Sequence, residues 1–289
     1  MKEKTFITVL TSESYFEGVL ALNESLKRVK AKYPLTVLIN NNISKETENK
    51  LIEREMKIIR KENIKLDSNI TKKNDVKNTS YWNNTFDKLL IFELTEFEKL
   101  VYLDSDMYIR NNIDNLFEKD DMSAVIDKRY NPLILESWKK LNSGLMVIKP
   151  KENILEGLME ALRTVESKRE TFGDQDVLQE YYNNWDNKSE LHLQDTYNVF
   201  FPYLDYHTHI QNMKLEDISV VHFVFADKPW YIKGEKRVEK YLERVNNHLK
   251  EMGEREKDPI VKDCIIVGNR DRTAILEEYF EILDSANNL

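Results

Sequence analysis

The chain has 289 residues, of which 41% are hydrophobic and 33% are charged, and its formal net charge is -8 at pH 7. A chain of this length can bury a substantial core, either as one large α/β domain with an appendage or as two small domains. The acidic balance excludes nucleic acid as the main partner, because neutralising phosphates requires a basic surface.

Residue types that are rare in the chain narrow its class further. The single cysteine, Cys264, cannot form an internal disulfide, which suits a reducing cytoplasm. The first residues enter a strand directly and no apolar run is long enough to span a bilayer, so we expect a cytoplasmic protein. None of the seven glycines forms a GxGxxG or GxxxxGK motif, so any nucleotide must be held without a Rossmann dinucleotide fingerprint or a P-loop.

Short β-rich runs alternate with amphipathic stretches up to about residue 150. Strands are expected at 5–10, 35–39, 57–66, 99–103, 123–127 and 144–148. Helices are expected at 14–30, at 45–56 with Ser44 as its cap, at 82–95, just after Pro150 and from near Asp174. The alternation predicts a mainly parallel sheet covered by helices.

The chain changes character after a late strand that is expected at 218–224. Apolar residues then recur at helical spacing in a highly charged stretch, namely at Val238, Tyr241, Val245, Leu249 and Met252. With a last helix expected at 272–285, we predict a helical C-terminal extension over 235–289 that follows a catalytic domain over 1–234. Its charged faces are expected to be solvated, and docking on a partner or on a membrane surface is the alternative.

The strongest chemical signal is the segment Tyr102-Leu103-Asp104-Ser105-Asp106. An apolar strand ends there with two carboxylates separated by one residue, and side chains at i and i+2 of a strand point the same way. Neighbouring carboxylates repel unless a cation lies beside them, and oxygen ligands suit Mg²⁺ or Mn²⁺, which also coordinate phosphate. The segment predicts a divalent-metal site for a diphosphate at the carboxyl end of a strand, and a polar strand end without a ligand is the alternative.

Further blocks accompany this segment along the chain. They read VLTSESYFEGVLALNESL at 9–26, FDKLLIFELTEFEKLVYLDSD at 86–106, NIDNLF at 112–117, NSGLMVI at 142–148, GDQDVL at 173–178 and HFVFADKPW at 222–230. In this order and spacing they resemble glycosyltransferase family 8, which includes glycogenin-like enzymes and bacterial glycosyltransferases of lipopolysaccharide and related glycans. The resemblance reaches from about residue 5 to 230. It implies a nucleotide-sugar-binding, Rossmann-like α/β core of the GT-A type, and retaining transfer of glucose or galactose from a UDP-hexose with Mn²⁺, or Mg²⁺, as cofactor.

The resemblance assigns a metal site and two basic residues. Asp104 and Asp106 correspond to the metal-binding pair of the family, and His222 corresponds to a third protein ligand. Without the resemblance, a histidine in an apolar strand would more often be a core residue. Lys228 corresponds to a clamp on the diphosphate, and Lys88 to a basic residue beside the donor sugar and phosphate.

The nucleoside is assigned to the first strand-to-helix turn, whose backbone is expected to read the base while a tyrosine ring stacks on it. The residues concerned are Val9, Leu10, Thr11, Ser12 and Tyr15. Ser12 stands where relatives often have Asn and can still form a hydrogen bond. Ser105, between the two aspartates, completes this part of the expected donor site.

The donor sugar is assigned to Asn142, Ser143, Asp174 and Gln175. Asp174 is expected to hold sugar hydroxyls and Gln175 to lie near the anomeric carbon, so that these two residues and Lys88 are the expected catalytic residues. Without the motif, Asp174 would be interpreted as a helix cap.

Phe225 departs from the family pattern, because relatives usually have a glycine there whose backbone approaches the diphosphate. A side chain at this position is expected to crowd the phosphate or to hold the loop open. A catalytically weak or inactive nucleotide-sugar-binding protein is therefore the alternative to an enzyme. A haloacid-dehalogenase-like phosphatase is a weaker alternative, because Tyr108 stands where that chemistry normally has Thr or Val.

The expected partners are a nucleotide-sugar donor and a glycan or lipid-linked saccharide acceptor, and no nucleic acid. A homodimer, and peripheral association with the inner membrane face through the C-terminal helices, are left open by the sequence.

Overall fold

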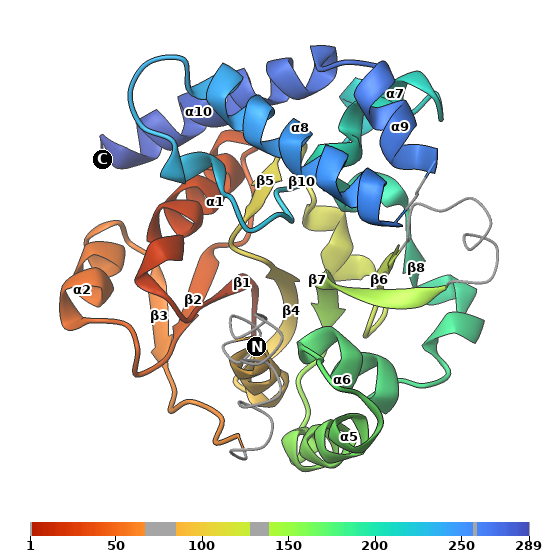
Figure 1. Ribbon diagram of the computed structural model, residues 1–289. Helices are drawn as coiled ribbons and strands as arrows, with labels where there is room; N and C mark the ends of the chain where they lie inside the picture. Colours follow the sequence, from red (N-terminus) through yellow and green to blue (C-terminus); the bar gives the residue numbers. More distant parts are fainter. Residues whose placement is uncertain (1, 67–84, 128–138, 257–258, 289) are drawn as a thin grey trace.

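A seven-stranded mixed sheet forms the centre of the protein, whose computed structural model describes residues 2–66, 85–127, 139–256 and 259–288 (Figure 1). In spatial order the strands are β3 (Lys57–Arg60), β2 (Leu35–Ile39), β1 (Glu3–Leu10), β4 (Phe97–Leu103), β7 (Lys140–Ile148), β6 (Ala124–Asp127) and β8 (His192–Leu193). The pairs β3–β2, β2–β1, β1–β4 and β6–β8 are parallel, whereas β4–β7 and β7–β6 are antiparallel. The predicted mainly parallel sheet is confirmed.

A second, three-stranded sheet lies beyond the carboxyl end of β4. It consists of β5 (Met107–Ile109), β10 (Val220–His222) and β9 (Val199–Phe200), with β10 in the middle. β10 pairs antiparallel with β5 and parallel with β9, and His222 is in register with both Met107 and Phe200. This register brings the end of the late strand to the residue that directly follows the two motif aspartates.

Hydrophobic clusters cover both faces of the large sheet. One contains residues of α5 (Ile154–Lys168), α6 (Asp174–Tyr181) and the 3₁₀ helix Phe86–Glu93, and the other contains residues of α1 (Phe16–Arg28) and α2 (Lys45–Glu53). Strand β4 contributes residues to both clusters, because its side chains alternate between the two faces of the sheet. Leu100 and Tyr102 belong to the first cluster, and Val101 and Leu103 to the second.

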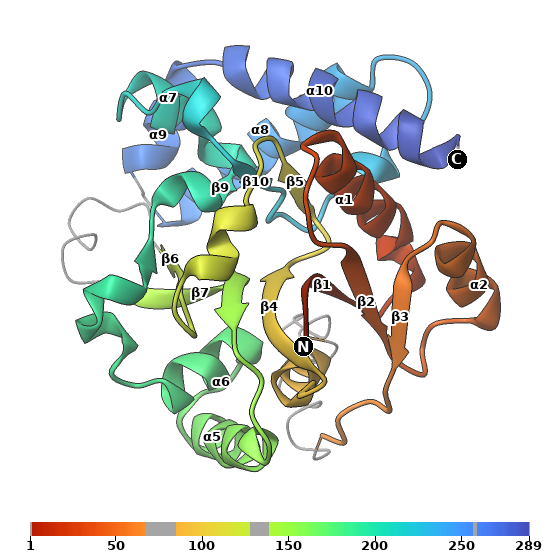
Figure 2. The same cartoon turned by 180° about the vertical axis from the view of Figure 1, so that it is seen from behind.

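The last helices close over the small sheet. α7 (Leu204–His209), α8 (Arg237–Glu256), α9 (Pro259–Ile266) and α10 (Arg270–Asn287) gather on this side, and α10 packs along α1 (Figures 1 and 2). The apolar residues Tyr241, Val245 and Leu249 of α8 are buried together with residues of β9 and β10. The apolar face that the spacing predicted is therefore turned toward the protein interior. No helix in the described ranges combines the length and the apolar character needed to cross a membrane.

The helix expected at 82–95 is a 3₁₀ helix over Phe86–Glu93, and residues 82–84 lie outside the described residues. A 3₁₀ helix has three residues per turn, so positions i, i+3 and i+6 share one side. Phe86, Leu89 and Phe92 have this spacing and are all buried in the first cluster. Packing against the sheet therefore favours the tighter helix over the predicted α-helix.

Most other elements lie near their predicted positions, but several boundaries moved. The third strand ends at Arg60 rather than at 66, and the strand expected at 144–148 begins four residues earlier, at Lys140. The helix expected just after Pro150 begins at Ile154, behind Asn153, whose φ is 61°. Strands β5, β8 and β9 and helices α7 and α9 were not predicted, because elements this short carry too little periodicity to be recognised.

The strand order creates a switch point beside β1. The chain leaves β1 toward β2 and β3 on one side and returns to β4 on the other side. In open α/β sheets, ligands bind in the crevice outside the carboxyl ends of the strands at such a point. The turn that holds Ser12 and Tyr15 follows β1, and Asp104 follows β4, so both predicted motifs lie at this crevice.

Candidate active site

Three potential metal ligands converge at the junction of the two sheets. Nε2 of His222 lies 3.1 Å from Oδ1 of Asp106 and 3.7 Å from Oδ2 of Asp104. One ligand atom from each of the three residues can be chosen so that all lie within 4.8 Å of one another. Backbone hydrogen bonds hold the segment on both sides, since the Asp104 amide donates to the carbonyl of Gly144 and the Phe223 amide donates to the carbonyl of Asp106. The structure thus brings together the three ligands that the sequence predicted.

The donor set fits a hard or borderline divalent cation. Two carboxylates and one imidazole are ligands that Mn²⁺ accepts, and Mg²⁺ accepts the carboxylates especially well. Three protein ligands leave coordination positions for phosphate oxygens. The residues present therefore fit the metal that the family resemblance implies, although the identity of the ion does not follow from them.

Two buried lysines pair with the motif aspartates. Nζ of Lys88 lies 3.1 Å from Oδ1 of Asp104 and 2.7 Å from Oδ2 of Asp174. Nζ of Lys228 lies 2.6 Å from Oδ2 of Asp106 and donates to the carbonyl oxygen of Phe223. Both lysines that the sequence singled out thus lie within direct reach of the predicted metal ligands.

The charges in this cluster shift one another's pKa values. Burial alone would raise the pKa of the Asp106 carboxyl, but Lys228 and His222 outweigh burial and hold that pKa below its usual value. Burial likewise would lower the pKa of Lys88, yet Asp104 and Asp174 outweigh it and raise that pKa. For Asp104, burial prevails over Lys88 and the pKa of the carboxyl is raised. A cation shared by both aspartates would relieve the cost of burying their charges.

Ser143, Asp174 and Gln175, three of the four residues predicted to bind the sugar, form a connected network with Lys88. The hydroxyl of Ser143 donates to Oδ2 of Asp174 at 2.8 Å, and the Ser143 amide donates to Oε1 of Gln175 at 3.0 Å. The amide nitrogen of Gln175 donates in turn to Asp127 at 2.9 Å. Because a backbone N–H identifies Oε1 as the oxygen, the orientation of the Gln175 amide is fixed.

Asp174 is not the cap of the helix that it begins. The N-cap of α6 is Gly173, whose amide donates to Oδ2 of Asp176 at 2.9 Å. The carboxylate of Asp174 instead binds Lys88 and Ser143, and its side chain is buried. The structural alternative that the sequence offered for Asp174 is therefore wrong, and its carboxylate faces the predicted site.

The turn that follows β1 and the segment around Trp230 are joined by a hydrogen bond and by ring packing. Ser12 caps the short 3₁₀ helix Glu13–Tyr15, and the indole of Trp230 donates to the carbonyl of Ser14 at 2.8 Å. The ring of Tyr15 packs edge-on against Trp230, and Nζ of Lys228 lies 5.7 Å from the centroid of the Tyr15 ring. The predicted nucleoside and diphosphate contacts are therefore neighbours. The nucleoside contacts were predicted for Val9, Leu10, Thr11 and Ser12 at the end of β1, and the diphosphate contact for Lys228.

Comparison with known proteins decides the family. Residues 6–233 match the model of glycosyl transferase family 8, which is most of the chain. The chain belongs to glycosyltransferase family 8. The resemblance inferred from the motif blocks is therefore confirmed.

Similar proteins agree with this assignment. Glycogenin-1 of Oryctolagus cuniculus is 29% identical over 236 residues, which are 80% of this chain and 66% of that protein, slightly under two thirds of its length. Galactinol synthase 2 of Arabidopsis thaliana is 24% identical over an alignment that covers 100% of this chain and 92% of that protein. The structure of the galactosyltransferase LgtC in complex with donor and acceptor sugar analogs superposes with a TM-score of 0.56 at 14% identity, over 84% of this chain and 94% of that chain. The fold of this family 8 member is of the GT-A type, as the sequence predicted.

The family-atypical Phe225 is turned toward the C-terminal helices. Its ring lies 4.2 Å, centroid to centroid, from the ring of His248 in α8, and it packs against the hydrophobic cluster that contains Tyr241, Val245 and Leu249. Its φ is not positive, so the backbone here does not require a glycine. Packing against α8 accounts for the phenylalanine at the position where the resemblance led us to expect a glycine.

A second group of potential ligands, Asp205, His209 and Asp271, has a structural role. Asp205 accepts hydrogen bonds from the amides of Asp271 and Arg272 and from Nε of Arg272, so it anchors the start of α10. Asp271 accepts a hydrogen bond from the hydroxyl of Thr208 in α7. These carboxylates are engaged in joining two helices and are not presented to a ligand.

Three residues of the site were missed by the sequence reasoning. Tyr102 donates to Oδ1 of Asp104, Asp127 accepts from Gln175, and Asn198 lies beside His222 at 2.9 Å. Tyr102 could have been found, because it stands only two positions before Asp104 in the motif segment itself. Asn198 had no such signal, since it precedes a strand of only two residues.

Proposed function

We propose that this family 8 member is a retaining hexosyltransferase. It transfers glucose or galactose from a UDP-sugar to an acceptor hydroxyl with Mn²⁺, or Mg²⁺, bound by Asp104, Asp106 and His222. The observation that carries the proposal is the convergence of these three ligand atoms within 4.8 Å at the switch point of the sheet, next to two buried lysines. A diphosphate is the substrate group that needs both a divalent cation and additional positive charge.

Different residues of the site are proposed to contact the two phosphates and the hexose of the donor. When bound, the metal neutralises the two phosphates and so makes UDP a better leaving group. Lys228 and Lys88 add positive charge beside the same phosphates, which requires that they exchange their present carboxylate partners for phosphate oxygens. Asp174 and Ser143 face the predicted position of the hexose, where the carboxylate accepts hydrogen bonds from sugar hydroxyls and orients the ring.

The geometry around Gln175 favours attack from the face that UDP leaves. A neutral amide is a poor nucleophile, and the Gln175 amide is already fixed by Ser143 and Asp127. In the proposed step the bond between the anomeric carbon and the phosphate oxygen breaks, and UDP departs with the electron pair. The acceptor hydroxyl forms the new bond on the same face, and its proton passes to the departing phosphate, so the configuration is retained.

The acceptor of this reaction is proposed to be a glycan or a lipid-linked saccharide. Residues 1–234 are proposed as the catalytic unit, and residues 235–289 as an extension that supports it. Phe223, which directly follows β10, and Tyr279 of α10 are buried in one hydrophobic cluster. This contact favours the proposal that the extension stabilises the catalytic unit.

A nucleotide-sugar-binding protein without activity is the second candidate, and Phe225 in place of the usual glycine is the observation that favours it. Slow Mn²⁺-dependent hydrolysis of a UDP-hexose separates the two functions, because a pure binding protein releases no UDP. Binding without any hydrolysis or transfer would favour this candidate.

Thermal unfolding with UDP-glucose, UDP-galactose and UDP-N-acetylglucosamine, each with Mn²⁺ or with EDTA, tests the proposed donor. A ligand that binds the native state raises the melting temperature, so the correct donor with Mn²⁺ should give the largest increase. Asp106→Ala should abolish both this increase and Mn²⁺-dependent UDP release. The exposed Asp120→Ala is the matched control and should behave as the wild type. Mn²⁺-dependent release that survives Asp106→Ala would refute the metal site.

A further inference from the structure

We propose that Asn198 is a positioning residue that sets the tautomer of His222. Together with Asn142 it keeps a proton on Nδ1, so that Nε2 is the ring nitrogen that faces Asp104 and Asp106 and is available to a cation. The inference rests on the proposed metal site for its consequence, but the tautomer itself is a property of the metal-free protein.

The argument starts at the backbone of Gly144. Its N–H donates to a side-chain atom of Asn142 at 2.9 Å. A backbone N–H can only donate, so the atom that it meets must be the carbonyl oxygen of Asn142 and not the amide nitrogen. The orientation of the Asn142 amide, which diffraction alone often leaves ambiguous, is thus determined by its partner.

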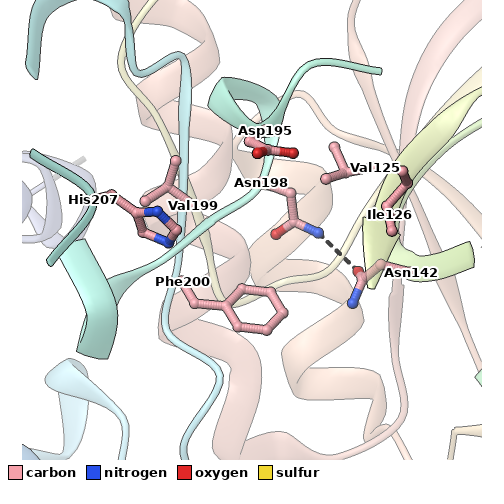
Figure 3. A pocket seen from close by; sticks show the side chains of 8 residues that line it. All are labelled: Val125, Ile126, Asn142, Asp195, Asn198, Val199, Phe200 and His207. Carbon is pink, nitrogen blue, oxygen red and sulfur yellow. Dashed lines mark hydrogen bonds between the residues drawn. The ribbon is translucent and has the colours of Figure 1, made fainter. Parts of the chain in front are cut away.

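The same oxygen determines the orientation of Asn198. Nδ2 of Asn198 donates to Oδ1 of Asn142 at 2.7 Å (Figure 3). Reversing the Asn198 amide would place two carbonyl oxygens against each other, so Oδ1 of Asn198 must be the atom on the far side. This atom lies 2.9 Å from Nδ1 of His222.

The tautomer of His222 follows from the Asn198 oxygen. A carbonyl oxygen can only accept, so Nδ1 must carry the proton. In the neutral ring the lone pair then belongs to Nε2, which lies 3.1 Å from Asp106 and 3.7 Å from Asp104. A lone pair that faces two carboxylates is unfavourable by itself and favourable around a cation. Histidine ligands are commonly oriented through the second ring nitrogen in this way.

Because Asn142 and Asn198 are buried, their amide groups are held in this one orientation. The exposed fractions of Asn142, Asn198 and His222 are 7%, 5% and 6%. Solvent therefore offers little compensation, and a reversed amide would leave buried polar groups unpaired. Asn142 and Asn198 line a pocket together with Phe200 and His207 (Figure 3), and its volume of about 20 Å³ is enough for one water molecule.

A close approach at Gly144 supports the same arrangement independently. A Cβ atom on this residue would lie 2.8 Å from Cε1 of His222 and 3.1 Å from Oδ1 of Asn142. Only glycine leaves room for the imidazole and the Asn142 carbonyl together. The hydrogen-bond chain therefore links β7 of the large sheet to β10 of the small sheet, and Gly144 lies in close contact with both Asn142 and His222.

The test uses ¹⁵N-histidine NMR of the metal-free protein at mildly alkaline pH, with the His222 signals assigned by His222→Gln. The expected spectrum has the proton on Nδ1 of His222. Asn198→Leu removes both hydrogen bonds at similar volume and fills the space that water could otherwise enter. It should shift the ring toward the Nε2–H tautomer or a mixture, and weaken Mn²⁺ binding by about 10- to 100-fold in a direct titration.

Asn198→Asp separates the tautomer from general stability. It retains an oxygen that accepts from Nδ1, so the Nδ1–H tautomer should persist, even though the loss of the donor to Asn142 lowers the melting temperature. Asn115→Leu is the matched control, because Asn115 is exposed and donates to the hydroxyl of Tyr197, and neither tautomer nor Mn²⁺ affinity should change.

Two outcomes would overturn the inference. The first is an Nε2–H tautomer of His222 in the metal-free wild type. The second is an Asn198→Leu protein that folds with the wild-type tautomer. If the wild type shows the Nδ1–H tautomer but binds no Mn²⁺, the positioning by Asn198 stands and the proposed metal-dependent function fails instead.

Discussion

Nζ of Lys228 lies 2.6 Å from Oδ2 of Asp106, so a residue assigned to the donor diphosphate is bound to a residue assigned to the metal. The side chain of Lys228 is buried, and its second partner is the carbonyl oxygen of Phe223. A metal bound at the proposed site would therefore compete with the lysine for one carboxylate. Binding of a diphosphate would offer the lysine a new partner and release Asp106 to the cation.

Lys228→Met should therefore separate metal binding from turnover. Without donor, Mn²⁺ should bind at least as tightly as in the wild type, because the competing ammonium is gone. Turnover should fall by about 100- to 1,000-fold, because positive charge beside the leaving group is lost. Mn²⁺ titration by electron paramagnetic resonance and a UDP-release assay measure the two effects. Lys233→Met, an exposed lysine paired with Glu17, is the control, and weaker Mn²⁺ binding in a folded Lys228→Met protein would contradict the expectation.

Metal removal should stop the reaction without unfolding the protein. Lys88 and Lys228 neutralise the motif aspartates when no cation is bound, so no unpaired pair of carboxylates remains in the site. With EDTA, UDP release should vanish while the far-ultraviolet circular dichroism spectrum stays unchanged. Activity should return when Mn²⁺ is added in excess. Cooperative unfolding caused by EDTA at ordinary temperature would show that the lysines do not replace the metal.

Gln175→Ala distinguishes positioning from covalent catalysis. If Gln175 only helps to hold the anomeric centre, its loss should lower kcat by about 100-fold and leave transfer measurable. Gln179→Ala in the same helix is the matched control, because the Gln179 amide donates to the backbone carbonyl of Leu141, which is not assigned to the donor. A Gln175→Ala protein with no activity above background would argue for a direct role in bond formation.

Gly18→Ala should disturb the motif loop through its backbone. A Cβ atom at this position would lie 2.6 Å from the carbonyl oxygen of Ser105 and 2.7 Å from the ring of Trp230. Relieving such an overlap should cost about 1–3 kcal/mol of the free energy of unfolding. Urea unfolding measures it. Gly157→Ala is the control, because the atom in its way belongs to the partly exposed ring of Tyr181, which can turn aside.

Arg272→Ala should loosen the C-terminal helices. The guanidinium is 1% exposed, binds Asp205 and donates to the carbonyls of Cys264 and Gly268. Its removal leaves a buried carboxylate without its charge partner, which typically costs about 3–5 kcal/mol. The midpoint of urea unfolding should fall accordingly. The neighbouring Arg270→Ala should change it little, because the side chain of Arg270 is 76% exposed.

Several features of the site could be predicted from the sequence because their signals are local. The apolar run before Asp104 predicted two carboxylates at the carboxyl end of a strand, and β4 does end at Leu103, although both aspartates lie in the turn before β5 and not on the strand. The glycine pattern argues against a P-loop. The order of the motif blocks was specific enough to indicate family 8, which the family match then confirmed. Helix α8 was predicted from the spacing of its apolar residues, which does not depend on the rest of the fold.

Other features depend on contacts between distant segments. His222 reaches the motif aspartates because β10, which lies within the strand expected at 218–224, pairs with β5, and β5 has three residues, too few for a periodic signal. The role of Asn198 and the direction of the Phe225 ring toward His248 likewise require the packed arrangement. The sequence by itself determined which residue types were available at each strand end and in what order. The tertiary structure alone decided which of them meet, because hydrogen bonds and ion pairs act over a few ångströms between groups that lie far apart in the chain.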